Sequence, residues 1–199
     1  MNVIICPGMH EIDLTKSFIS GLSDFNSDIF SCLSSVKILI YLGNNLKTLS
    51  AFHILNFLFE KIEDMKSPII FIAFSAGVVG GLQAAYLWQF LGGRVKAFIA
   101  IDGWGVPLFG NFPIHTISHD YFTHQSLLRM SGGNNNFYAQ PAVEHLEIWR
   151  SPQSVRGWWV NPNLTTKSTK TYLTVSEFLH MLLKHYEKIS PENQLGKRE

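Results

Sequence analysis

A serine, a set of histidines and several aspartates are the residues of this sequence whose types suggest covalent chemistry. Ser75 stands among small residues in the segment AFSAG, between the apolar run IIFIAF and a second apolar run. Histidine and aspartate recur later, in IHTISHDYFTH (114–124) and QPAVEHLEIW (140–149). A serine hydroxyl attacks an acyl carbon well only when a base takes its proton, and imidazole titrates near neutral pH, so a nucleophilic serine requires a nearby histidine.

The elements that must position these side chains follow a strand-helix alternation. Apolar segments predict strands at 2–6, 36–42, 69–74, 95–101 and 114–118, with a last short strand at 137–139. Helical spacing predicts helices at 13–22, 50–65, 76–91 and 174–189, the last opening with a capping box at Thr174 and Glu177. This alternation predicts an α/β fold with a doubly wound, mainly parallel sheet flanked by helices on both faces.

Residues 69–91 contain no charged side chain, and an uncharged run of this length is the usual sign of a transmembrane helix. Pro68 opens the run, and the β-branched and aromatic residues of IIFIAF are typical of a fully buried parallel strand. The remainder is rich in Ala and Leu and ends at Gly92-Gly93, as a helix does. We therefore expect a buried strand and helix here, and no integral membrane segment.

Ser75 then lies at the carboxyl end of a central strand, where parallel sheets gather their binding and catalytic groups. The segment AFSAG resembles the nucleophile elbow of the α/β-hydrolase superfamily, the pattern G-x-S-x-G with Ala73 in the first glycine position. The resemblance extends over residues 2 to about 150. Larger members of the superfamily insert a lid between late strands, and the corresponding stretch at 102–113 is short here, so the chain resembles a small member without a large lid. The alternative is a serine that only caps a helix.

The resemblance implies a role for several residues. The chain order of the superfamily is nucleophile, acid, histidine, which makes Asp120 the acid and His145 the general base beside Ser75, with Asp102 as an alternative acid. The oxyanion hole takes the N–H groups of Ala76 and of Met9, in the loop CPGMHE. Residues expected to contact the substrate are His10, in the pocket, and Trp104, in an apolar wall.

Histidines also bind metals, and His115, His119 and His124 lie beside Asp120 in one segment. Positions four apart in a strand are roughly 13 Å from each other, too far for one ion. We expect no metal and no other cofactor, because nothing else in the sequence suggests one.

Composition limits the partners and the compartment. The net charge is +1, only 16% of residues are charged and no basic cluster occurs, so nucleic-acid binding is not expected. Cys6 and Cys32 suit buried, reduced thiols, and the N-terminus has no positively charged region of a signal peptide. We expect a cytoplasmic and monomeric protein, with one domain at 1–190 and a flexible tail at 191–199.

An ester or thioester with an apolar acyl group is the substrate that this resemblance suggests, cleaved through a Ser-His-Asp triad and an acyl-enzyme. The alternative is a catalytically inactive protein that keeps the hydrolase fold for binding or regulation. The alanine in place of the first glycine and the choice between two acids favour the alternative, whereas the serine, the late histidine and the oxyanion loop oppose it.

Overall fold

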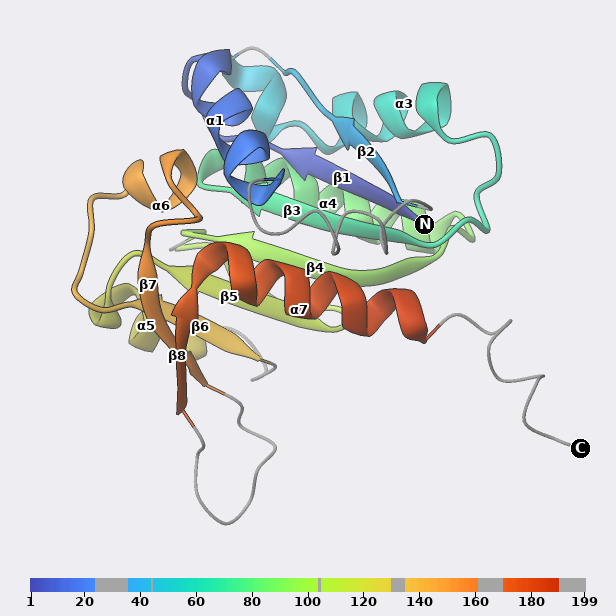
Figure 1. Ribbon diagram of the computed structural model, residues 1–199. Helices are drawn as coiled ribbons and strands as arrows, with labels where there is room; N and C mark the ends of the chain where they lie inside the picture. The colour runs from blue at the N-terminus through green and yellow to red at the C-terminus, as the bar shows by residue number, and fades with distance from the viewer. Residues whose placement is uncertain (24–35, 44, 104, 130–134, 161–169, 190–199) are drawn as a thin grey trace, which may run out of the picture.

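The computed structural model describes residues 1–23, 36–43, 45–103, 105–129, 135–160 and 170–189 of the chain. Within these residues, eight strands form one sheet in the order β2-β1-β3-β4-β5-β6-β7-β8 (Figure 1). The strands are β1 (Asn2–Cys6), β2 (Lys37–Ile40), β3 (Ile69–Phe74), β4 (Val95–Ile101), β5 (Ile114–Ser118), β6 (Asn136–Ala139), β7 (Arg156–Val160) and β8 (Lys170–Thr174). β1 to β6 pair in parallel, and β7 and β8 continue the sheet antiparallel. The α/β class and the mainly parallel sheet predicted from the sequence are confirmed.

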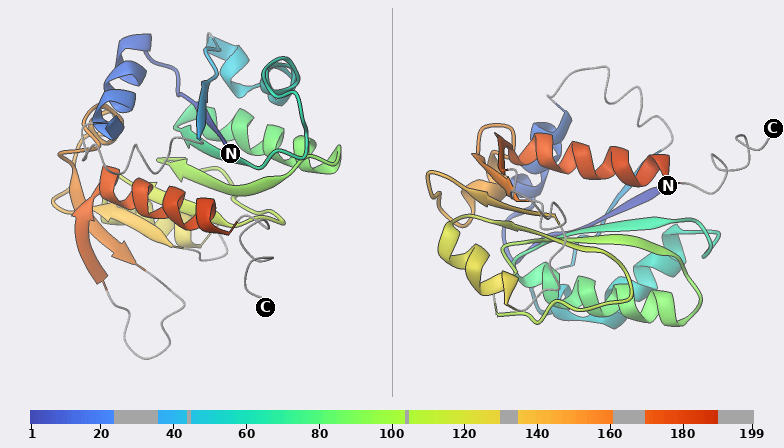
Figure 2. Two further views of the ribbon diagram at one scale, coloured as in Figure 1. Left: turned by 45° about the vertical axis from the view of Figure 1, so that its right-hand side comes forward. Right: turned by 90° about the horizontal axis from the view of Figure 1, so that it is seen from below.

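Helices cover both faces of the sheet. They are α1 (Ile12–Ser23), α3 (Ala51–Lys61), α4 (Ala76–Phe90), α5 (Tyr121–Leu128), α6 (Glu147–Arg150) and α7 (Val175–Lys188), with a 3₁₀ helix η1 (Asn45–Leu49) before α3. One apolar core lies between the sheet and α3, α4 and α5, and a second lies between the sheet and α1, α6 and α7. Figure 2 shows α1 and α7 on one side of the sheet and α3 and α4 on the other.

The central strands form because their side chains are apolar on both faces. Every residue of β3, IIFIAF, and of β4, VKAFIAI, is buried. A strand covered on both sides reads as a continuous apolar run, since successive side chains alternate between two cores. The uncharged run 69–91 is thus divided between β3 and α4, as predicted, and α4 ends before Gly92, whose φ of 93° suits a glycine. Within the described residues, no helix is long and apolar enough to cross a membrane.

The predicted elements agree with the structure most closely in the first half of the chain. β1, β3, β4 and β5 have the predicted bounds, and the capping box of Thr174 and Glu177 opens α7. The predicted helix 50–65 is shorter, since α3 ends at Lys61 and Ile62 is already extended. The pair β7 and β8 was not predicted. Their sequences, RGWWV and KTYLT, pair with each other and with β6 in a part of the chain where no clear period was visible.

Two sequence expectations reach outside the described residues. The tail at 191–199 lies there, and so does Cys32. Cys6 is fully buried at the end of β1, and this burial raises the pKa of its thiol to about 12. The expectation of a buried thiol is therefore confirmed for Cys6.

Candidate active site

Ser75 occupies a tight turn between β3 and α4. Its φ of 51° and ψ of −122° are unusual for a residue other than glycine, so the turn is strained. This backbone conformation belongs neither to the strand nor to the helix, and it sets the direction of the Ser75 side chain. The Ser75 N–H donates to the carbonyl of Ile101, 2.9 Å away, which ties the turn to the end of β4. Strained serines at strand-to-helix turns are the geometry of a nucleophile elbow.

Small residues let the turn close. A Cβ at Gly77 would overlap the carbonyl oxygens of Cys6 and Pro7, so only glycine allows α4 to approach the end of β1 this closely. Ala73, on β3, lies next to Gly81 of α4, and a Cβ built on Gly81 would lie 3.4 Å from the Ala73 methyl. That distance is an ordinary van der Waals contact, so the Ala73 methyl is not crowded by α4. The departure from G-x-S-x-G is therefore compatible with the turn.

His145 contacts the serine hydroxyl. Its Nε2 lies 3.1 Å from Ser75 Oγ, although the two residues are 70 positions apart in the chain. His145 sits just before α6, and its ring stacks on Phe74 with centroids 4.9 Å apart. Phe74 in turn stacks on Trp149, which stacks on Phe18. This aromatic stack, formed by Phe18, Trp149, Phe74 and His145, holds the imidazole from one side.

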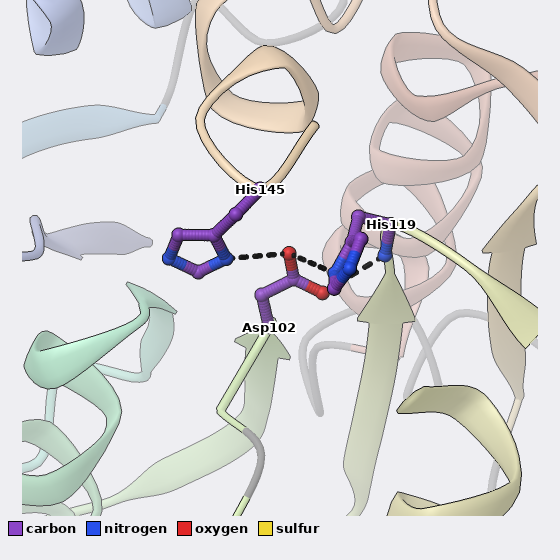
Figure 3. Close-up of side chains that lie close together, drawn as sticks. All are labelled: Asp102, His119 and His145. Atoms are coloured by element: carbon purple, nitrogen blue, oxygen red, sulfur yellow. Dashed lines mark hydrogen bonds and ion pairs between the residues drawn. The ribbon is translucent and has the colours of Figure 1, made fainter. Parts of the chain in front are cut away.

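Asp102 is the carboxylate that His145 contacts. Its Oδ2 lies 2.9 Å from His145 Nδ1, and the side chain is fully buried (Figure 3). Asp102 directly follows β4, and its φ of 50° turns the carboxylate toward the end of the sheet. Because a carboxylate oxygen only accepts, His145 Nδ1 carries the proton and Nε2 is left to accept the Ser75 O–H. The structure thus brings Ser75, His145 and the alternative acid Asp102 together.

Asp120, the acid expected from the sequence, has a different place. It is the N-cap of α5, and its Oδ1 accepts the N–H of Thr123 at 2.7 Å. Burial would raise its pKa, but the hydrogen bonds from Thr123 and the charge of His119 lower the pKa of Asp120 below its ordinary value. The expectation that Asp120 orients His145 is corrected, because the capping bond directs this carboxylate into its own helix and toward His119, not His145.

His119 also contacts Asp102, a position that the sequence did not predict for it. Its Nδ1 lies 2.8 Å from Asp102 Oδ2, and its backbone N–H donates to Asp102 Oδ1 at 2.9 Å. The hydrogen bond to Asp102 raises the pKa of His119 above its ordinary value, against the effect of burial. Its position directly after β5 was the available signal, since the carboxyl ends of β4 and β5 are adjacent.

Of the expected oxyanion-hole and substrate-binding residues, Met9 and His10 lie in the loop after β1, and Ala76 follows Ser75 directly. Ala76 is the first residue of α4, so its N–H has no acceptor within the helix. Gly8 brings the loop that contains Met9 against the serine, since a Cβ built on Gly8 would lie 3.0 Å from Ser75 Cβ. His10 lines a cavity of about 270 Å³ together with Met9. Trp104 lies outside the described residues.

Asp102, His119 and His145 also form a group of metal-ligand type, with one atom of each within 4.8 Å of the others. The two imidazole nitrogens lie 2.8 and 2.9 Å from one carboxylate oxygen. Ligand atoms around a tetrahedral zinc ion would be about 3.3 Å apart, whereas these distances are those of N–H···O hydrogen bonds. The histidines first considered do not gather, since His115 contacts Tyr186 and His124 packs on Tyr138. That no metal is needed stays a prediction.

No family model fits this sequence, and no curated protein is sufficiently similar to count as a relative. The function must therefore be argued from the geometry of the site.

Proposed function

We propose that the chain is a serine hydrolase of the α/β-hydrolase superfamily, with Ser75 as nucleophile, His145 as general base and Asp102 as the acid. The observation that carries the proposal is the continuous contact from Ser75 Oγ to His145 Nε2 at 3.1 Å, and from His145 Nδ1 to Asp102 Oδ2 at 2.9 Å. The three residues come from separate turns at the carboxyl ends of parallel strands, where such sheets carry their active sites.

The acylation step follows from these contacts. Ser75 Oγ attacks the acyl carbon of the substrate while its proton passes to His145 Nε2, and the carbonyl oxygen becomes an oxyanion. The buried carboxylate of Asp102 stabilises the imidazolium that forms and keeps the Nδ1–H tautomer. The intermediate then collapses, the bond to the leaving oxygen or sulfur breaks, and that atom takes the proton from Nε2. The product of this step is an acyl ester on Ser75.

Deacylation repeats these steps with water as the nucleophile. His145 Nε2 takes a proton from the water as its oxygen attacks the acyl carbon, and the second oxyanion collapses with release of the carboxylic acid. The proton on Nε2 returns to Ser75 Oγ. In both steps the oxyanion faces the N–H of Ala76 at the start of α4, where the helix dipole favours negative charge, and the N–H of Met9.

The substrate class is an ester or thioester with an apolar acyl group. A cavity of about 300 Å³ lies between α4 and the loop after β4 and is lined largely by apolar side chains, namely Val79, Leu82, Tyr86, Val106, Pro107 and Phe109. Val79 lies about one turn of α4 beyond Ser75, so this end of the cavity is about one helical turn from the nucleophile. An apolar surface of this size suits an acyl chain and offers little to a charged substrate.

Labelling with a fluorophosphonate probe tests the function, because such probes phosphonylate serines that a neighbouring base activates. We expect labelling at Ser75 in wild type, and none in Ser75→Ala with unchanged circular dichroism. p-Nitrophenyl esters of increasing chain length, and an acyl thioester, then establish the acyl preference. Folded wild-type protein that the probe leaves unlabelled would instead indicate an inactive protein with the same fold.

A further inference from the structure

Two imidazole rings share one carboxylate oxygen in this site. Both His145 Nδ1 and His119 Nδ1 lie within 2.9 Å of Asp102 Oδ2, and the His119 backbone N–H occupies the other oxygen (Figure 3). An orienting carboxylate needs only one imidazole to serve a Ser-His-Asp triad. The second ring therefore calls for its own explanation.

The side chain of His119 restricts how Asp102 can rotate. With the backbone N–H of His119 on Oδ1 and its ring Nδ1–H on Oδ2, the carboxylate is held at both oxygens by one residue. Oδ2 then faces His145 in a fixed direction. Hydrogen bonds that orient a catalytic group in this way typically change activity by about 10- to 100-fold when they are removed.

The far side of the same ring faces a second carboxylate. His119 Nε2 lies 3.6 Å from Asp120 Oδ2, so the unprotonated nitrogen of the neutral ring points its lone pair toward negative charge. A proton at Nε2 converts this repulsion into an ion pair of the His119 imidazolium with Asp120, and the charged ring then lies between the two carboxylates. Glu144 adds a further negative charge nearby, and His145 is the other titratable group that faces the ring, with centroids 5.9 Å apart.

Protonation of His119 opposes the chemistry at His145. A cation on His119 neutralises part of the Asp102 charge that the His145 imidazolium requires during the reaction. It also repels that imidazolium directly across 5.9 Å. The two histidines thus compete for one carboxylate oxygen, and their protonations are coupled.

We propose that His119 is a positioning residue that holds Asp102 for catalysis, and that protonation of its ring at Nε2 weakens the support that the Asp102 charge gives to His145. This inference rests on the proposed serine hydrolase function and adds a response to pH. The hydrogen bond to Asp102 raises the pKa of His119 above its ordinary value, so its ring takes up a proton at a higher pH than a free imidazole does. The fall of activity with decreasing pH should therefore be steeper in wild type than in a variant that has no titratable group at position 119.

Two substitutions distinguish the effect of the hydrogen bond from position 119 to Asp102 from the effect of a positive charge at that position. In His119→Asn, the amide nitrogen is attached to Cγ, as Nδ1 is in histidine, so a donor to Asp102 remains but cannot titrate. His119→Leu removes both donor and charge. His53→Asn, at an exposed histidine on α3, is the matched control with unchanged rates. Each protein is examined for folding by thermal melting.

The rate constant of fluorophosphonate labelling at Ser75 is measured from pH 5.5 to 9.5. At pH 9 we expect His119→Leu to react about tenfold more slowly than wild type and His119→Asn to lose less. When the pH is lowered from 9 to 6, the labelling rate constant of His119→Asn divided by that of wild type should rise by about tenfold. The rate constant of His119→Asn divided by that of His119→Leu should stay the same, because neither variant can be protonated at position 119.

Three outcomes would overturn the inference or its basis. A folded His119→Leu variant with wild-type rates would show that His119 does not position Asp102. Superimposable pH profiles of wild type and His119→Asn would rule out the competition for Oδ2. Absence of labelling in wild type at every pH would reject the hydrolase function itself, and is distinguished from the first two because they require a reactive wild-type Ser75.

Discussion

The imidazole of His145 lies almost parallel to the phenyl ring of Phe74, with centroids 4.9 Å apart and 22° between the planes. Phe74 is the residue directly before the nucleophile, so the strand that carries Ser75 also supports the base. Trp149, two residues into α6, stacks on the same phenyl ring and links it to the core beneath α1. The site is therefore supported by aromatic packing as well as by hydrogen bonds.

Phe74→Leu should slow fluorophosphonate labelling of Ser75 by about 10-fold or more, because the His145 ring loses its stacking contact and its Nε2 is no longer held in hydrogen-bond alignment with Ser75 Oγ. Stability should fall by about 1 to 2 kcal/mol, measured by urea unfolding. Phe71→Leu is the control, since Phe71 is equally buried on β3 but packs on Phe98 in the opposite core. It should lose similar stability and keep the labelling rate. Equal loss of rate in both variants would argue against a role for the stack.

Ser75→Gly should make the protein more stable while it abolishes labelling. The φ of 51° costs a serine about 1 kcal/mol that a glycine does not incur, so the midpoint of urea unfolding should rise. Ser75→Ala keeps a Cβ in the same strained turn and should show no such gain. If glycine and alanine have the same unfolding midpoint, the turn does not store strain.

Asp102→Asn should reduce hydrolysis of a p-nitrophenyl ester by about 10⁴-fold in kcat with little change in KM, the loss known when a triad carboxylate becomes an amide. Asp120→Asn should lower kcat by less than about fivefold, since Asp120 contacts His119 and the N–H of Thr123 and has no hydrogen bond to His145. Asparagine also caps helices, so α5 should keep its stability. A reversed order of the two losses would restore Asp120 as the acid.

Two glycines of α4 should respond to alanine with opposite signs. Gly77→Ala should cost about 1 to 3 kcal/mol and slow labelling, because its Cβ would overlap the carbonyls of Cys6 and Pro7 beside the nucleophile. In Gly81→Ala the new Cβ meets Ala73 at 3.4 Å, so the gain in helix propensity, about 0.5 to 1 kcal/mol, should predominate. Unfolding curves measure both, and a stabilised Gly77→Ala would contradict the close approach of α4 to β1.

Stability should decline as the pH falls from about 6.5 to about 4. Burial lowers the pKa of His115 and of His124 to about 4, so both rings stay neutral in the folded protein while an unfolded chain takes up protons near 6.5. The stability that these rings contribute is complete above 6.5 and is lost as the pH falls through their folded pKa. In urea unfolding at pH 7 and pH 4.5, His124→Gln should show a smaller decline than wild type. His53→Gln, at an exposed site, should decline as wild type does.

The sequence by itself determined the elements whose signal is local. The buried strand, the small residues around Ser75 and the capping box of α7 each depend on neighbours within a few positions, and all occur as predicted. The resemblance to the α/β-hydrolase superfamily implied that His145 lies beside Ser75, and the structure places the two side chains in contact. β7 and β8 were not predicted, since a strand pair of this kind depends on its partners more than on its own composition.

Only the tertiary structure decided which carboxylate serves His145. Asp102 and Asp120 follow adjacent parallel strands, so their positions in the chain are equivalent candidates for the acid. The backbone after each strand separates them: a φ of 50° turns Asp102 into the site, whereas Asp120 is extended and accepts the N–H that opens α5. A side-chain direction set by one backbone angle leaves no trace in residue type or spacing. The position of His119 directly after β5 indicated that it lies near Asp102, but its hydrogen bond to Asp102 depends on where that carboxylate points.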